Sequence, residues 1–162
     1  MGEFKGSVPT GSRVVAMAPE LGMAYNGHWK FPEQMGPPHI GFIYLVRDNV
    51  LKRFYLGKKK FITLDRGRPV RDGWLYYKSS SKTMADIFKF RPSEEFDFIC
   101  LEQYKSLGSL SYAETWTLCF VEAPTSKTWY NTRIEKVSWA VKEPISQRHK
   151  DRLAAAMAFQ EV

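Results

Sequence analysis

The clearest pattern in the chain is a pair of strand-like apolar runs within residues 41–57. GFIYLV is followed by a polar break, RDN, and a few residues later by a second run, RFYLG. Two such runs joined by turn-forming residues are typical of an antiparallel hairpin. A turn centred on Asn49 and Val50 would place Tyr44 directly opposite Tyr55. Both rings would then project from one face of the hairpin, with Cβ atoms roughly 5 Å apart.

The rest of the pattern predicts three helices and one more strand. Ser81 is suited to cap a short helix that Pro92 ends, and a second helix is expected from Ser111 to the residue before Pro124. Between them, EFDFICLEQY alternates in the manner of a strand. The predicted elements are strands at 41–46, 53–57 and 95–104, and helices at 82–90, 111–123 and 145–159. This order predicts an α+β fold, a small three-stranded antiparallel sheet flanked by helices with a C-terminal helical tail.

Composition suggests three regions along the chain. Residues 1–40 are rich in Gly, Pro, Met and Ser, and we expect an extended or disordered lead-in there. Residues 41–131 are expected to form one globular domain, because a chain of 162 residues that is 44% hydrophobic can bury one sizeable core. Residues 132–162 are expected to form a basic helical tail.

Charge makes a polyanion the expected partner. The formal net charge is +7 and the pI is about 9.4, and a basic protein gains affinity for nucleic acid by releasing condensed counterions. A basic protein without any nucleic-acid role is the alternative. The distribution of charge is more informative, because a single segment contains a cluster of cationic residues and only two aspartates. That cluster is Lys58, Lys59, Lys60, Arg66, Arg68 and Arg71.

Other residue types limit the class of protein. Cys100 and Cys119 lie among apolar residues, so we expect buried free thiols in a reducing, cytoplasmic compartment. His28, His39 and His149 have no partner at ligand spacing, which argues against a zinc site. No apolar run reaches the roughly 18 to 20 residues of a membrane-spanning helix, so no membrane partner is expected.

Four features together resemble the GIY-YIG nuclease superfamily, and in particular its small phage-encoded, homing-type members. The dipeptide IY at 43–44 and the tripeptide YLG at 55–57 look like the two signature elements, at the family's spacing. Glu114, on a helix after the third strand, and Asn131, in WYN, match the family's metal-binding glutamate and trailing asparagine. The resemblance covers roughly residues 41–131, so the expected globular domain is a nuclease domain.

The resemblance implies a metal-dependent DNA endonuclease that hydrolyses phosphodiester bonds, encoded by a phage or mobile element and acting in the cytoplasm of a bacterial host. Glu114 would hold Mg²⁺ or Mn²⁺, and Asn131 would support the site. Tyr44 or Tyr55 would be the general base or would orient the attacking water, helped by a pKa lowered by the ion and nearby lysines. Tyr77 would occupy the proton-donor position. A homodimer is a possible assembly, since a double-strand break requires two cuts.

The phosphate-binding residues follow less directly from the resemblance. The family places a phosphate-clamping arginine on a helix after YLG, but Pro69 and the glycines of KKKFITLDRGRPVRDG oppose a helix there. Lys59 or an arginine of this segment would then be the clamp. Arginines and a lysine of the tail would contact DNA phosphates, or the tail helix would pack its apolar side on the main domain. The candidate phosphate-binding residues are Gly57, Lys58, Lys60, Arg66, Arg68, Arg71, Arg148, Lys150 and Arg152.

Structural explanations exist for several of these residues. Glu114 stands three residues after Ser111, so the pair could form a capping box. Gly57 could end a strand, Asn131 could be a turn residue, and Tyr77 could pack on Trp74. At the level of function, the alternatives are a catalytically inactive, nuclease-derived module that binds nucleic acid or a host protein, and an unrelated basic structural protein.

Overall fold

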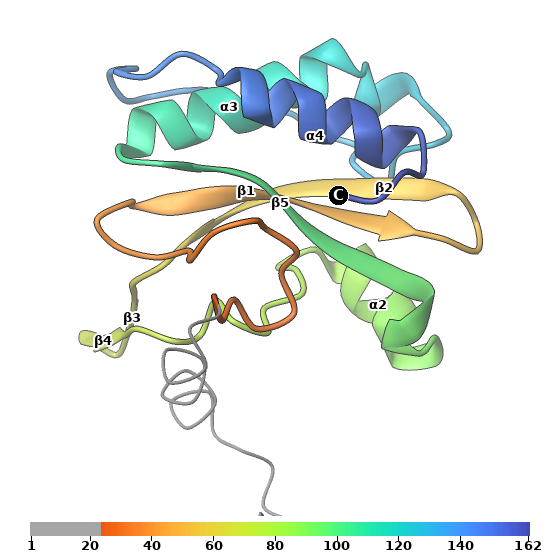
Figure 1. Cartoon of the computed structure of the whole chain (residues 1–162), viewed down its shortest axis with the longest axis horizontal. Coiled ribbons are helices and arrows are strands. Elements are labelled where there is room, and N and C mark those ends of the chain that lie inside the picture. The colour runs from red at the N-terminus through yellow and green to blue at the C-terminus, as the bar shows by residue number, and fades with distance from the viewer. Residues whose placement is uncertain (1–23) are drawn as a thin grey trace, which may run out of the picture.

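The computed structural model describes residues 24–162, and the predicted α+β class with a C-terminal helix is confirmed (Figure 1). Residues 1–23, more than half of the expected lead-in, lie outside the described residues. The elements are β1 (Gly41–Asp48), β2 (Arg53–Lys60), β3 (Thr63–Asp65), β4 (Arg68–Val70), α2 (Lys82–Phe90), β5 (Phe96–Tyr104), α3 (Leu107–Phe120) and α4 (Gln147–Met157), with short 3-10 turns at Ser93–Glu95 and Ala123–Thr125.

The main sheet has the order β2-β1-β5, and both pairings are antiparallel. The predicted hairpin register is wrong by two residues, because the loop has four residues rather than two. Asp48 closes this loop by accepting hydrogen bonds from the amides of Val50 and Leu51, at 3.0 and 2.9 Å. Tyr44 therefore lies opposite Gly57. A shift of two residues keeps side chains on the same face, so Tyr44 and Tyr55 still share one, with ring centroids 6.2 Å apart.

Two cores lie on opposite faces of this sheet. Helices α3 and α4 cover one face, where Leu45 and Leu153 belong to the same buried cluster. Helix α2 and the segments around residues 24–40 and 61–77 cover the other face, where Trp29 and Tyr44 are buried together. Strand β1 is central and all of its residues are buried, which explains its near-continuous apolar sequence.

Helix boundaries differ from the sequence expectation at one important place. Helix α2 begins behind Ser81 as predicted, with the Met84 amide donating to the serine hydroxyl at 3.3 Å. Helix α3, by contrast, begins at Leu107 behind the N-cap Ser106. The predicted start at Ser111 is wrong, because that serine is buried inside the helix and Ser106 supplies the cap.

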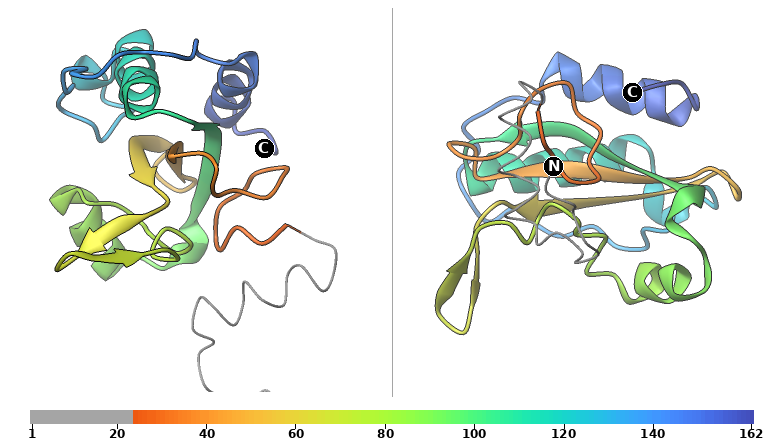
Figure 2. Two further views of the ribbon diagram at one scale, coloured as in Figure 1. Left: turned by 90° about the vertical axis from the view of Figure 1, so that its left-hand side faces the viewer. Right: turned by 60° about the horizontal axis from the view of Figure 1, so that its bottom comes forward.

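The segment between β2 and α2 forms no helix, as the sequence analysis expected, but it contains a small β3–β4 hairpin (Figure 2). One other expectation was wrong: Cys119 is exposed, and only Cys100 is a buried free thiol. Among residues 24–162, none of the helices is both long and apolar enough to cross a membrane.

Candidate active site

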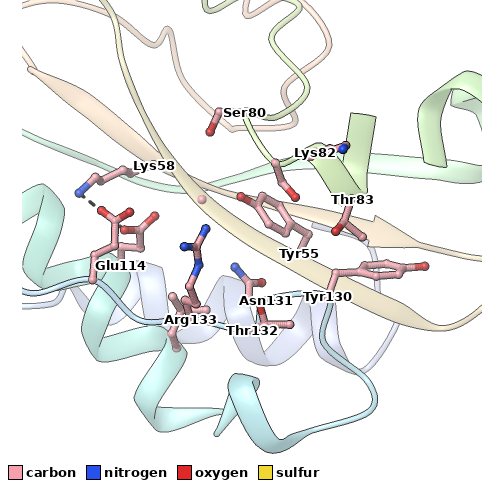
Figure 3. A pocket seen from close by; sticks show the side chains of 14 residues that line it. Tyr55, Lys58, Ser80, Lys82, Thr83, Glu114, Tyr130, Asn131, Thr132 and Arg133 are labelled. Atoms are coloured by element: carbon pink, nitrogen blue, oxygen red, sulfur yellow. Dashed lines mark ion pairs between the residues drawn. The ribbon is translucent and has the colours of Figure 1, made fainter. Parts of the chain in front are cut away.

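A cavity of about 530 Å³ opens at the edge of the main sheet, beside β2 (Figure 3). Its walls come from the middle of β2, the start of α2, the middle of α3 and the segment 130–135. The lining residues are Tyr55, Gly57, Lys58, Ser80, Ser81, Lys82, Thr83, Glu114, Leu118, Tyr130, Asn131, Thr132, Arg133 and Glu135. Segments far apart in the sequence thus bring the tyrosine and glycine of the YLG motif in β2 together with Glu114 and Asn131.

The edge of β2 is only partly covered, and this creates the opening. Phe54 exchanges backbone hydrogen bonds with Thr128 and Tyr130, at 2.9 and 2.7 Å. At Leu56 the side-chain amide of Asn131 takes over: its oxygen accepts from the Leu56 amide and its nitrogen donates to the Leu56 carbonyl, both at 2.8 Å. Asn131 therefore imitates a peptide group and ends the covered part of the strand. It is not a turn residue.

Gly57 follows immediately, and its lack of a side chain has a structural cause. A Cβ at this position would overlap the hydroxyl and ring of Tyr44, which lies across the glycine from the neighbouring strand. The alternative that Gly57 ends a strand is wrong, because β2 continues to Lys60. The glycine lets Tyr44 reach the strand edge from behind, while Tyr55 lines the cavity itself.

The two tyrosines are held in their neutral form by their surroundings. Tyr44 is 1% exposed, and burial raises its pKa well above the usual range, with the neighbouring phenols of Tyr55 and Tyr77 acting in the same direction. Burial also raises the pKa of Tyr55. The lowering of a tyrosine pKa by a bound ion and nearby lysines stays a prediction. Both side chains are hydroxyl donors in the absence of added positive charge.

Glu114 reaches the cavity from the middle of α3. The capping-box explanation for it is wrong, because the helix starts at Leu107 and Glu114 lies two turns inside it. Its carboxylate is 3.6 Å from the ammonium of Lys58, and its side chain is only 14% exposed. Burial raises its pKa, the charge of Lys58 opposes this, and the nearby carboxylate of Glu135 adds to it. A carboxylate in this state is stabilised by any cation that enters the cavity.

Glu114 and Glu135 offer a donor set that fits a hard divalent cation. Mg²⁺ is commonly bound through one or two carboxylates and keeps several waters, and both carboxylates line one open, polar cavity. Within residues 24–162 there is no group of three or more His, Cys, Asp or Glu placed to hold a metal. The residues present therefore suit a partly hydrated Mg²⁺ or Mn²⁺ better than a closed zinc or calcium site.

Two lysines that follow Gly57 point to different faces of β2. Lys58 lines the cavity and donates to the Ser111 hydroxyl at 3.1 Å. Lys59 lies on the other face, with its ammonium 4.3 Å from the centre of the Tyr77 ring, and burial lowers its pKa. The Tyr77 ring meets the Tyr44 ring edge-on, at 5.9 Å between centroids. Neither Lys59 nor Tyr77 lines the cavity, so the two stand behind the site.

The predicted arginines of the β2–α2 segment are not at the cavity. Arg66, Arg68 and Arg71 are exposed on or beside the β3–β4 hairpin. The cavity instead contains Lys82, from the first turn of α2, and Arg133, which lies between Glu114 and Asn131 in Figure 3. These two residues and Glu135 were not expected from the sequence. Of the three, only Arg133 has a signal in the sequence, because it lies two residues after the signature asparagine.

The tail arginines have partners inside the protein. Arg148 pairs with Glu102 at 2.6 Å and with Glu33 at 2.9 Å. Arg152 donates to the backbone carbonyls of Cys100 and Lys30, both at 2.8 Å. These bonds, together with buried Leu153, attach α4 to β5 and to the segment 30–33. The third candidate of the tail, Lys150, is exposed beside the Trp116 ring, 5.6 Å from its centre.

One comparison with known proteins identifies the family. Residues 25–134 match the family model described as "Putative endonuclease segE, GIY-YIG domain". No curated protein and no solved structure matches the chain. The matched residues make up more than half of the chain and include the Tyr44, Tyr55, Glu114 and Asn131 positions. The chain therefore belongs to the segE-type GIY-YIG endonuclease family.

Proposed function

We propose that this protein is a metal-dependent DNA endonuclease whose reaction takes place in the cavity at the edge of β2. The family is that of an endonuclease, and the likeness to small phage-encoded members favours a phage or mobile-element origin. The observation that carries the proposal is the convergence of Tyr55, Glu114 and Arg133 on one cavity, at a point where the strand edge is bare.

Phosphodiester hydrolysis needs a positioned water, neutralisation of the charge on the transition state and a proton for the leaving oxygen. The phosphate would enter at the bare edge of β2 beside Gly57, with the Tyr44 hydroxyl behind the glycine. Arg133 and Lys82 are the cationic groups that would hold its oxygens, and the planar guanidinium of Arg133 can donate two parallel hydrogen bonds. These two residues replace the family's helical arginine in the proposal.

Tyr55 is the residue proposed to orient the attacking water, since its hydroxyl is the tyrosine group that lines the cavity. Tyr44 supports it from behind Gly57, and Lys59 and Tyr77 pack against Tyr44 in turn. A divalent cation held by Glu114, with Glu135 beside it, would supply positive charge to the phosphate and to nearby hydroxyl groups. Lys58 would keep the Glu114 carboxylate ionised and correctly placed before the cation binds.

A catalytically inactive binding module is the second candidate. The absence of a helix, and hence of the helical arginine, between β2 and α2 favours it. The retained Glu114 opposes it, because burial raises the pKa of this carboxyl despite the nearby charge of Lys58. A largely buried acid costs stability and serves no evident packing purpose here.

Supercoiled plasmid distinguishes the two candidates. Purified protein would be incubated with the plasmid in Mg²⁺ or in EDTA, with nicked and linear products followed on a gel and DNA binding measured in parallel by fluorescence anisotropy. The nuclease proposal predicts nicking in Mg²⁺ and none in EDTA. Binding without cutting in either Mg²⁺ or Mn²⁺, on plasmid, branched and single-stranded DNA, would establish the binding module instead.

A further inference from the structure

The β3–β4 hairpin has no part in the active site or in the hydrophobic core. Its strands are joined through Arg66 and Gly67, both with positive φ, at 52° and 78°, as in the tight two-residue turns of β-hairpins. None of the residues from 62 to 73 is buried. Leu64 is even 73% exposed. The hairpin projects from the body of the protein (Figures 1 and 2).

The base of the hairpin, in contrast, is firmly attached. Phe61 and Trp74, which flank it, are 1% and 6% exposed, and their rings meet edge-on at 5.0 Å between centroids. Both belong to the core cluster that contains Tyr44. The hairpin is therefore a short, defined projection held by two aromatic anchors, and its exposed residues do not contribute to the core.

The arginines of the hairpin lack the carboxylate partners that several other arginines have in the described part of the chain. Several arginines elsewhere have carboxylate partners: Arg47 with Asp97, Arg91 with Asp48, and Arg148 with Glu102. Arg66, Arg68 and Arg71 are exposed and take part in no side-chain hydrogen bond or ion pair among residues 24–162. Three exposed guanidinium groups that have no partner among the described residues can bind an external anion.

The hairpin also continues the basic surface of the active site. Strand β2 carries Lys58 in the cavity and ends at the exposed Lys60. Only two residues separate this end from β3. Along the chain, Lys58, the exposed Lys60 and the three hairpin arginines therefore follow one another from the cavity to the hairpin.

We propose that the β3–β4 hairpin binds double-stranded DNA beside the cleaved bond, with Arg66, Arg68 and Arg71 on its phosphates. A two-stranded ribbon has dimensions that fit a DNA groove, and arginine binds phosphate through paired hydrogen bonds. The inference rests on the proposed function for the identity of the nucleic acid. The hairpin would hold the substrate in position and leave the chemistry to the cavity, which separates its role from that of the clamp that sequence analysis expected.

The test is the salt dependence of duplex binding in EDTA, where no cutting can occur. Each phosphate contact adds about 0.9 to the slope of log affinity against log salt on B-DNA. The R66Q/R68Q/R71Q variant should therefore lower the slope by about 2 to 3 and weaken binding about tenfold or more at 0.1 M salt. The matched control is K105Q/K127Q/K142Q, three exposed lysines outside the hairpin and cavity. It changes net charge equally and should alter the slope by less than about 1.

Further variants and substrates make the outcome decisive. R66K/R68K/R71K keeps the charges and should retain the slope. Equal effects of the hairpin and control variants would overturn the inference, and so would an equal loss on single-stranded DNA of the same sequence. The salt slope and the affinity are both measured without cleavage. A protein that binds through the hairpin but never cuts would therefore refute the proposed function and leave the role of the hairpin intact. Circular dichroism would confirm that each variant is folded.

Discussion

Asn131 is expected to act by holding β2 in place, and its removal gives a quantitative test. In N131A the buried amide and carbonyl of Leu56 lose both of their partners at 2.8 Å. Each orphaned buried group costs about 1 to 3 kcal/mol. Water from the adjoining cavity would satisfy part of this demand, so a loss of about 2 to 4 kcal/mol is expected. For a chain of this size that corresponds to a decrease in Tm of roughly 5 to 15 °C.

Thermal and urea unfolding would measure this loss, and cutting at low temperature would measure its effect on activity. T132A is the matched control, because Thr132 is the exposed neighbour in the same cavity wall, and its Tm should stay near that of the parent. N131D retains the acceptor for the Leu56 amide but sets a carboxylate against the Leu56 carbonyl. The loss of stability in N131D should be large at pH 7. The loss should become smaller as the pH falls toward about 4, where the new carboxyl is protonated. An N131A protein with parental stability and no activity would refute the positioning role and indicate direct participation in chemistry.

Three further outcomes are expected. G57A forces a methyl group onto the Tyr44 ring, so it should lose about 1 to 3 kcal/mol of stability by urea unfolding and most of its cutting; parental values for both would contradict the packing described for these strands. R133A should lower the nicking rate by about 10 to 1,000-fold with an unchanged Tm. R133K should recover only part of the lost rate. Nicking by R133A at the parental rate would show that Arg133 is not part of the site. Burial lowers the pKa of His149 to about 4, below the value of about 6.5 in an unfolded chain. The contribution of the neutral imidazole to stability is therefore complete above about pH 6.5 and is lost as the pH falls toward 4. H149Q should flatten this dependence, measured by urea unfolding between pH 7.5 and 4.5, and an identical pH profile would refute the assignment.

The sequence predicted the class of fold because its signals were local. Alternation in residues 41–57 and 95–104, the cap at Ser81 and the prolines each depend on a few neighbours in the chain. The hairpin register was missed because Asp48 stabilises a longer loop by accepting two amide hydrogen bonds. The start of α3 was missed because Ser106 and Ser111 are equally suitable caps in sequence. The hydrogen bond that the Ser109 amide donates to the Ser106 hydroxyl, at 3.2 Å, shows which serine is used.

The candidate site was predicted as far as the resemblance extends. Tyr55, Glu114 and Asn131 do line one cavity. Of the cationic residues expected from the sequence, Lys58 lines the cavity, whereas Lys82 and Arg133 were not expected there. A phosphate clamp is defined by its position in space, and no periodicity marks these two residues. Burial of Tyr44 was equally hidden, since a tyrosine in an apolar run has the same sequence pattern whether it lines a cavity or lies behind it. Its raised pKa follows from that burial.

The most direct test of the central claim is the single-turnover nicking rate of E114Q in Mg²⁺, compared with the parent and with E122Q. Glutamine preserves the shape of Glu114 and removes the charge that would bind the cation, while Glu122 is exposed after α3 and does not line the cavity. We expect E114Q to be folded, at least as stable as the parent because a largely buried carboxylate has gone, and slower by about 100-fold or more. E122Q should cut at the parental rate. Cutting by E114Q at the parental rate, with the same metal requirement, would contradict the assignment of Glu114 and the mechanism built on it.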